Sequence, residues 1–193
     1  MTRPRTAVLW VTLLFAAACS SPPQEHHYTL TPASATAPAA GAASTPSVAV
    51  GPVTLPESVD QPQLVVQAGA NQVARYDLHR WAGPLKSEIA RVIAANLAQD
   101  LGTTRVWVYT QAALSNPDYQ VLVDVQRFDS ALGDAAVIEA LWTVRRAAGG
   151  DPKTGRSLVR EPASGAGFDP LVAAHSRALA RVSRDIADAI RAP

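Results

Sequence analysis

The chain has 193 residues, of which 48% are hydrophobic, and its 17 Lys+Arg nearly balance its 16 Asp+Glu. A surface that binds nucleic acid needs clustered basic residues, so this composition argues against nucleic acid as a partner. The length suffices for one domain with a sizeable core.

Residues 1–18 have the three parts of a lipoprotein signal peptide. Arg3 and Arg5 supply a positive start, residues 7–15 form an apolar run, and three alanines precede Cys19. Cys19 is the only cysteine, so it cannot form a disulfide within the chain. Its thiol is placed to accept a diacylglycerol before cleavage. Cleavage then makes Cys19 the new N-terminus, whose α-amino group can take an N-acyl chain. The apolar run is shorter than the roughly 20 residues of a spanning helix, so we expect a lipid-anchored protein.

The residue after Cys19 bears on which membrane holds the anchor. An Asp at this position would resemble the inner-membrane retention signal of Gram-negative lipoproteins, whereas Ser20 stands there. This favours the inner leaflet of the outer membrane, with the body of the protein facing the periplasm.

Residues 19–46 separate the lipid site from the main body of the chain. Residues 31–45 are nearly all Ala, Pro, Thr, Ser and Gly, a composition that cannot bury enough surface to fold and that is typical of a tether. The preceding His27-Tyr28-Thr29-Leu30 is an isolated apolar island. It could be an accident of the linker, but we expect a short strand that adds to a sheet, with Tyr28 and Leu30 as candidate partner-binding residues.

Residues 47–193 are predicted to form a single periplasmic domain of the α/β (α+β) class. Hydrophobic periodicity predicts an edge strand at 48–53, a hairpin of strands at 63–67 and 72–78, and a helix from Pro84 to Leu101 with Gly102 as its C-cap. Strands follow at 105–109, 119–128, 137–147 and 157–160, with a turn at 149–152. A last helix begins at Pro170, capped by Asp169. We therefore expect a single mixed β-sheet of about six to seven strands with two main helices packed on it.

Arg80 and Trp81 precede the first predicted helix and allow two interpretations. An exposed Trp beside an Arg has the composition of a protein-interface hot spot, which makes both candidate partner-binding residues. A Trp at this position more often closes the end of a core, with Arg80 pairing a nearby carboxylate such as Asp77.

The residue types that usually form catalytic or metal sites do not come together in a recognisable pattern. Gly150–Ser157 resembles a phosphate-binding loop, but Arg156 replaces the lysine and a strand, not a helix, is predicted to follow. The four histidines lack metal-ligand spacing with carboxylates or thiols: His26, His27, His79 and His175. We therefore expect a non-catalytic protein with no cofactor other than the lipid on Cys19.

Several separated motifs agree in order and spacing with one known family. They are the lipid-site cysteine followed by Tyr28-Thr29-Leu30, then Val50-Gly51-Pro52-Val53, Asp60 to Val65, and His79-Arg80-Trp81-Ala82 with Pro84-Leu85. Over most of the mature chain the sequence resembles the ABC-type transport auxiliary lipoprotein family, the PqiC-like membrane integrity-associated transporter subunits.

The resemblance implies an auxiliary subunit of a lipid transport system that maintains the Gram-negative envelope. Its expected partner is an MCE-domain protein, with ATP hydrolysis on another subunit, and a partner with rotational symmetry would favour a homo-oligomeric ring. The alternative is an outer-membrane lipoprotein that scaffolds or regulates another envelope machine, for cell-wall synthesis or secretion.

Overall fold

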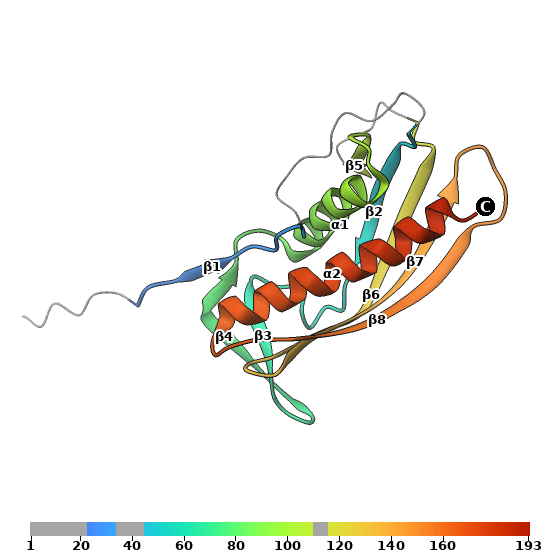
Figure 1. Ribbon diagram of the computed structural model, residues 1–193. Coiled ribbons are helices and arrows are strands. Elements are labelled where there is room, and N and C mark those ends of the chain that lie inside the picture. The colour runs from blue at the N-terminus through green and yellow to red at the C-terminus, as the bar shows by residue number, and fades with distance from the viewer. Residues whose placement is uncertain (1–22, 34–44, 110–115) are drawn as a thin grey trace, which may run out of the picture.

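The computed structural model describes residues 23–33, 45–109 and 116–193 (Figure 1). Their strands form two sheets, with the orders β1-β4-β3 and β5-β2-β6-β7-β8. The elements are β1 (His26–Tyr28), β2 (Val48–Thr54), β3 (Gln63–Gly69), β4 (Gln72–Trp81), α1 (Leu85–Leu101), β5 (Val106–Val108), β6 (Tyr119–Ala131), β7 (Ala135–Arg146), β8 (Lys153–Pro162) and α2 (Phe168–Arg191).

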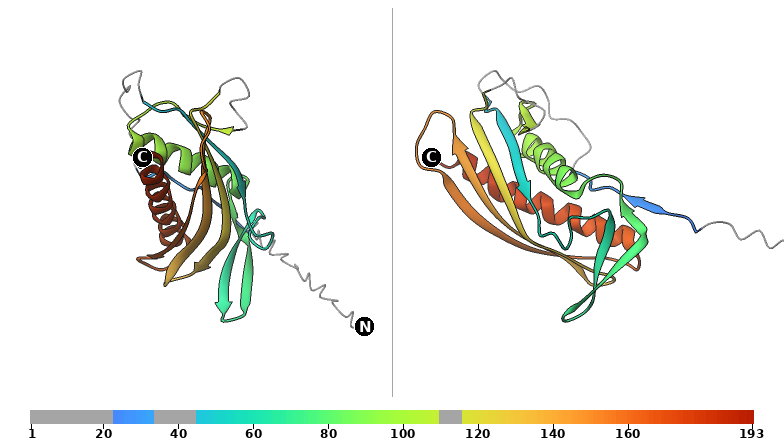
Figure 2. Two further views of the ribbon diagram at one scale, coloured as in Figure 1. Left: turned by 90° about the vertical axis from the view of Figure 1, so that its right-hand side faces the viewer. Right: turned by 180° about the vertical axis from the view of Figure 1, so that it is seen from behind.

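Both helices pack on the same face of the five-stranded sheet (Figure 2). The alternation predicted for β6 places Val121, Val123 and Val125 in the core, because every second side chain of a strand points to the same face. The α+β class with two packed helices is thus confirmed. The prediction of a single sheet is wrong, because the strands form two sheets. β1 pairs with the edge of β4 that β3 leaves open, so these three strands form a separate sheet.

The three-stranded sheet contains the predicted hairpin and the predicted N-terminal strand. β3 and β4 are antiparallel, and their turn extends away from the rest of the molecule (Figure 1). β1 runs parallel to β4, with His26 opposite His79 and Tyr28 opposite Trp81. The apolar island is therefore a docked strand, as the sequence predicts.

The prediction of an edge strand at 48–53 is wrong, because this strand lies inside the five-stranded sheet. β2 lies between β5 and β6 and is parallel to both. Pro52 has no N–H to donate, which is why it suggests an edge. The register of the β2–β6 ladder shifts between Val50 and Val53, so Pro52 falls where no regular pair is required.

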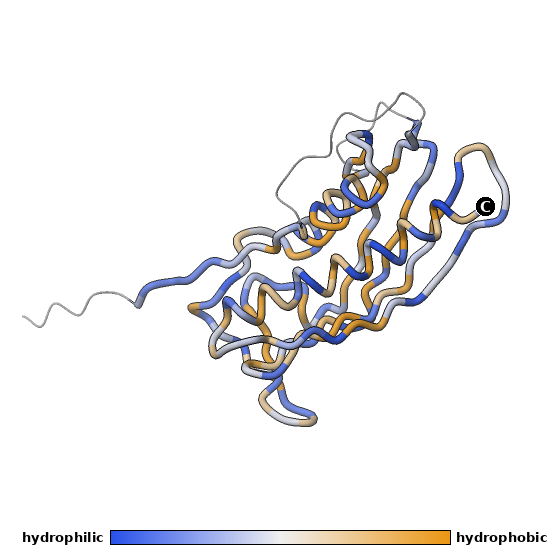
Figure 3. The backbone as a smooth tube through the Cα atoms, viewed as in Figure 1, coloured by the Kyte–Doolittle hydropathy of each residue, from blue (hydrophilic) through white to orange (hydrophobic). Residues whose placement is uncertain are grey.

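The structure has the cap predicted for the end of α1 but not the one predicted for the start of α2. Gly102 closes α1 in the left-handed conformation (φ 62°) and donates its N–H to the carbonyl of Gln99, which confirms the predicted C-cap. α2 begins at Phe168, after Gly167, so Asp169 lies within its first turn and does not cap it. The negative charge of Asp169 in the first turn still interacts favourably with the helix dipole. Figure 3 shows hydrophobic and hydrophilic residues alternating in short stretches along α2, as an amphipathic helix requires.

The turn predicted at 149–152 joins β7 to β8, so the segment that resembles a phosphate-binding loop leads into a strand. Across this pair Trp142 lies opposite Gly155. A Cβ at Gly155 would lie 2.1 Å from Cζ2 of Trp142, so only glycine leaves room for the indole. The indole N–H donates to Ser157 Oγ at 3.0 Å.

Candidate functional site

A pocket of about 430 Å³ opens where β1, the end of β4 and the start of α1 meet. Mostly apolar pockets with a few polar groups are the usual sites for small ligands or for side chains of a partner. We call it the Trp81 pocket, and its lining comprises the apolar Pro62, Trp81, Pro84 and Leu85, the small Ala82 and Gly83, and the polar His27, Asp60, Gln61 and Arg80.

Arg80 and Trp81 have different positions in this pocket. Trp81 is 6% exposed and packs edge-on against Phe128, with ring centroids 6.1 Å apart, so it belongs to the core and only touches the pocket from within. Arg80 is half-buried, and its Nη1 lies 3.2 Å from Oε1 of Glu25. The carboxylate that pairs with Arg80 is therefore Glu25 on the N-terminal segment rather than Asp77.

Residues 26–33, which we call the strap, are held along the body by hydrogen bonds to the backbone groups of the strap. The N–H of Ala82 donates to the carbonyl of Tyr28 at 2.7 Å. The strap then passes α1, where Arg91 Nη2 donates to the carbonyl of Leu30 at 2.6 Å and the N–H of Ala33 donates to Asn96 Oδ1 at 2.8 Å. These bonds fix the strap over its whole length.

Side chains secure the same segment. Leu30 is fully buried in the main core, which makes it a structural residue of the body. Thr29 Oγ1 donates to Glu88 Oε2 at 2.6 Å, and Arg91 pairs with the same carboxylate at 2.7 Å. Burial opposes ionisation of this carboxyl, but the hydrogen bonds from Arg91 and Thr29 prevail and hold the pKa of Glu88 below its usual range.

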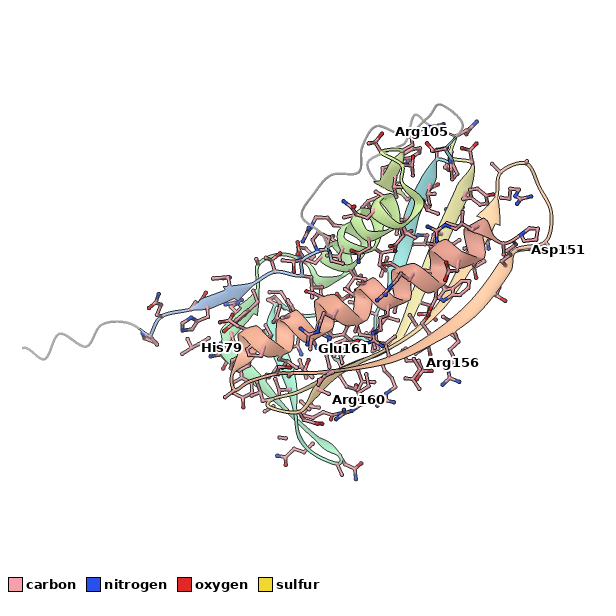
Figure 4. All side chains as sticks on the ribbon, viewed as in Figure 1. His79, Arg105, Asp151, Arg156, Arg160 and Glu161 are labelled. Atoms are coloured by element: carbon pink, nitrogen blue, oxygen red, sulfur yellow. The ribbon has the colours of Figure 1, made fainter. Side chains whose placement is uncertain are left out.

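A cluster of rings attaches the beginning of the strap to β4 and α2. Tyr28 Oη and His79 Nδ1 are 2.7 Å apart, and the His79 ring stacks on Phe168 with centroids 3.8 Å apart. His26 also stacks on His79, with ring centroids 5.1 Å apart. Figure 4 places His79 beside β1. The cluster makes the position of the strap depend on the packing of these rings.

The surroundings of this cluster favour the neutral forms of its members. Burial and the adjacent His26 lower the pKa of His79, and burial and the charge of Asp169 raise the pKa of Tyr28. A neutral imidazole can share a hydrogen bond with the Tyr28 hydroxyl and stack on Phe168 without the cost of a desolvated charge. The arrangement therefore suits a structural attachment rather than proton transfer.

A second histidine is buried beside a serine within the core. His175 Nε2 and Ser130 Oγ lie 2.7 Å apart, and the imidazole stacks flat on Phe128 at 4.0 Å. Burial lowers the pKa of His175 to about 3. Its Nδ1 has no hydrogen-bond partner, so no carboxylate orients the ring, and both side chains are closed off from solvent. This pair therefore lacks the oriented base that a nucleophilic serine needs, and His175 is a packed residue of the core.

The remaining predicted sites give less structural information. Cys19 lies outside the described residues. Within residues 23–33, 45–109 and 116–193, His, Cys, Asp and Glu form no group of three or more that could hold a metal ion. Over the same residues, no helix is long and apolar enough to cross a membrane.

Three residues that position the strap were missed at the sequence level. His79 carries no metal-site spacing, so only its neighbours in space reveal its role. Arg91 has the appearance of a solvated helix residue. Asn96 offers a usable signal, because a buried amide among the apolar residues of α1 requires hydrogen-bond partners, and it finds them in Ala33 and Ser183.

Comparison with protein families identifies one match over most of the chain. Residues 28–187 match the family described as ABC-type transport auxiliary lipoprotein component. The match begins at the last residue of β1 and ends near the end of α2, so it includes β2 to β8, α1 and most of α2. No curated protein matches the chain in sequence.

Solved structures share this fold at low sequence identity. A crystal structure of an uncharacterized protein has a TM-score of 0.71 and 21% identity, and the match covers 87% of this chain and 99% of that chain. Protein XCC0632 of the DUF330 family, from Xanthomonas campestris, has a TM-score of 0.63 and 19% identity, with 84% and 92% covered. The arrangement of two helices on a mixed sheet is thus shared with other proteins.

Proposed function

This chain belongs to the ABC-type transport auxiliary lipoprotein component family, and we propose that it is the outer-membrane-anchored docking subunit of an MCE-type lipid transporter. In this proposal residues 1–18 are removed as a signal peptide, and the lipid on Cys19 inserts into the inner leaflet of the outer membrane. The body, which begins with the strap and continues through residues 47–193, faces the periplasm. Membership of the family is the observation that carries the proposal.

The Trp81 pocket supports docking better than chemistry. It offers an apolar recess with the half-buried guanidinium of Arg80 at its rim, which suits an apolar side chain next to a carboxylate on a partner protein. Tyr28 and Leu30 contribute by holding the strap beside the pocket. ATP hydrolysis belongs to another subunit of the transporter.

A ring of copies is a further part of the proposal. An MCE-domain partner with rotational symmetry would present several equivalent ends, and each copy of this chain could receive one. The mass of the lipidated protein in detergent, alone and with its partner, tests this point.

In-cell crosslinking tests the proposed partner. The full chain is crosslinked in its native host and captured proteins are identified by mass spectrometry, beside a Cys19→Ala variant. We expect an MCE-domain protein to be captured, and to be lost or reduced when Cys19 cannot be lipidated. An Arg80→Glu variant should also capture less of it.

Arg156→Glu is the matched control for Arg80→Glu. Arg156 likewise pairs with one glutamate, Glu139 at 2.7 Å, but it lies on the far side of the sheet from α2 (Figure 4). The Arg156→Glu variant should capture as much of the partner as the unchanged chain does. Capture of cell-wall enzymes or secretion components alone would contradict the transport function and favour the alternative of a scaffold for another envelope machine.

A further inference from the structure

A second pocket, of about 390 Å³, lies between the strap and α2. Three arginines of α2 line it, Arg177, Arg181 and Arg184. Their spacing of four and three residues places them on one face of the helix. The strap contributes residues 31–33 to the same lining. We call this pocket the arginine groove.

A single carboxylate, that of Glu161 in β8, holds two of these arginines beside the groove (Figure 4). Its side chain is only 5% exposed, and it pairs with Nε of Arg177 at 3.4 Å and with Nε of Arg181. A buried carboxylate is costly without its cations, so the two pairs give both guanidinium groups defined positions. Arg177 also donates from Nη2 to the carbonyl of Pro162 at 2.6 Å. No other described residue accepts a hydrogen bond from the guanidinium of Arg181, whose Nη groups can therefore donate to a ligand.

The groove carries more positive charge than its own carboxylate balances. Three guanidinium groups and one carboxylate line it, which leaves a net charge of +2. Arg184 donates to the carbonyl of Ala180 at 3.4 Å, and its charge interacts with Asp100, which Arg191 also approaches. All 16 Asp and Glu of the chain lie within the described residues. The rest of the chain therefore holds no carboxylate that could balance the groove.

Three guanidinium groups at one recess suit an anion with several oxygen atoms. Guanidinium donors match the oxygens of both carboxylates and phosphates. A carboxylate offers two oxygens and one charge, whereas a terminal phosphate offers at least three oxygens and nearly two charges. The second fits the charge of the groove better. Pro32, Ala33 and Ala173 also line the groove and offer apolar surface to carbon atoms next to the phosphate.

We propose that the arginine groove binds a doubly charged phosphate group, either free phosphate or the terminal phosphate of a lipid. The two sources share the chemistry that the groove recognises. This site is separate from the Trp81 pocket, so it does not depend on the proposed docking of a partner there. Because the strap forms part of the groove, a bound phosphate would contact both the strap and α2 and would stabilise the docked strap.

Calorimetric titration of the full chain in an uncharged detergent tests the site at pH 8, where a terminal phosphate is doubly charged. The probes are inorganic phosphate and glycerol 3-phosphate. We expect binding, and we expect Arg184→Gln to weaken it roughly tenfold or more through the loss of charge-assisted hydrogen bonds. Arg184 does not pair with Glu161, so this variant keeps both pairs of the buried carboxylate and should remain folded.

Arg160→Gln is the matched control. Arg160 is an exposed arginine next to Glu161 in β8, but it pairs with Asp134 and does not line the groove. This variant should bind the probes as the unchanged chain does. Tighter binding of glycerol 3-phosphate than of inorganic phosphate would identify a lipid as the source, and equal or weaker binding would identify free phosphate.

Three results would overturn the proposal. They are no binding of either probe at millimolar concentration, binding that Arg184→Gln leaves unchanged, and binding of succinate as tight as that of phosphate. The last result would instead assign the groove to an acidic segment of a partner protein.

Amide hydrogen exchange checks that the phosphate binds in this groove. The N–H of Thr31 donates to Ser176 Oγ at 3.1 Å, and that of Ala33 donates to Asn96 Oδ1, so both amides report on the docked strap. Phosphate should slow exchange in a peptide that contains residues 31–33 of the unchanged chain, but not of Arg184→Gln. Slower exchange only in other parts of the chain would place the phosphate elsewhere and overturn the assignment.

Discussion

At the scale of single residues, the buried His175 connects the packing of the core to pH. Its imidazole is enclosed by α2, Phe128 and Ser130, and burial lowers its pKa to about 3. In the unfolded chain the same group has a pKa of about 6.5. Between these two values the unfolded state binds a proton that the folded state does not.

The free energy of unfolding should therefore decrease as the pH falls below about 6.5. The decrease should be on the order of 1 kcal/mol per pH unit until about pH 4.5, where carboxyl groups begin to contribute. His79, whose pKa is also lowered, adds in the same direction. Urea unfolding at several pH values measures this slope.

A His175→Gln variant serves as the control for this slope. The amide can still bond to Ser130 but takes up no proton, so its stability should depend less on pH between 6.5 and 4.5 than that of the unchanged chain. Equal slopes for the two proteins would show that His175 is not the group responsible.

Gly155 leaves open the space that the indole ring of Trp142 fills. Its Cβ would overlap the indole of Trp142, so we expect Gly155→Ala to lower the free energy of unfolding by about 1–3 kcal/mol through overpacking. Combining it with Trp142→Leu, which removes the ring, should cost less than the sum of the two single changes. Chemical denaturation of the three variants gives this coupling, and additive costs would argue against the contact.

At the scale of elements, the strap contributes Leu30 to the main core and packs Tyr28 against it. Leu30 is fully buried, so Leu30→Ala should lower the free energy of unfolding by about 2–5 kcal/mol. Leu158→Ala removes the same atoms from an exposed site and should change it by about 0.5 kcal/mol or less. If both variants unfold at the same urea concentration, the strap does not contribute to the core.

Elements with a strong local signal could be predicted from sequence. α1 has an apolar face at helical spacing and a glycine at its end, and the β3–β4 hairpin has two short apolar runs around Gly69. The position of β2 could not be predicted in this way, because Pro52 argues for an edge and the register shift that accommodates it is a property of the ladder with β6.

The candidate site shows the same limit. The apolar island at Tyr28 and Leu30 predicts a docked strand, but its partner β4 and the parallel direction depend on contacts between distant residues, such as Tyr28 with His79. Trp81 could be placed at the end of the core from its position before a helix. The pairing of Arg80 with Glu25 could not, since the two are 55 residues apart.

At the scale of the whole molecule, the docked strap divides the chain between Cys19 and β2 into two stretches with different consequences. In the proposed anchoring, only residues 19–25 separate the lipid on Cys19 from the body, whereas residues 34–44 join the strap to the next described segment. A free tether covering all of residues 19–46 would respond equally to added length at any point. With the strap docked, only length added before His26 lets the body move away from the membrane.

An insertion of about ten Gly and Ser residues tests this difference, since it would add roughly 15–20 Å of reach. The insertion is placed either after Ser21 or after Ala39, and energy transfer is measured from a label on Leu158→Cys to acceptor lipids in vesicles. We expect the first insertion to reduce the transfer and the second to leave it unchanged, because hydrogen bonds at Tyr28, Leu30 and Ala33 hold the strap to the body in both proteins. Equal reductions would mean that the strap detaches when the protein is on the membrane, and the distance between anchor and pocket would then be set by the full length of residues 19–46.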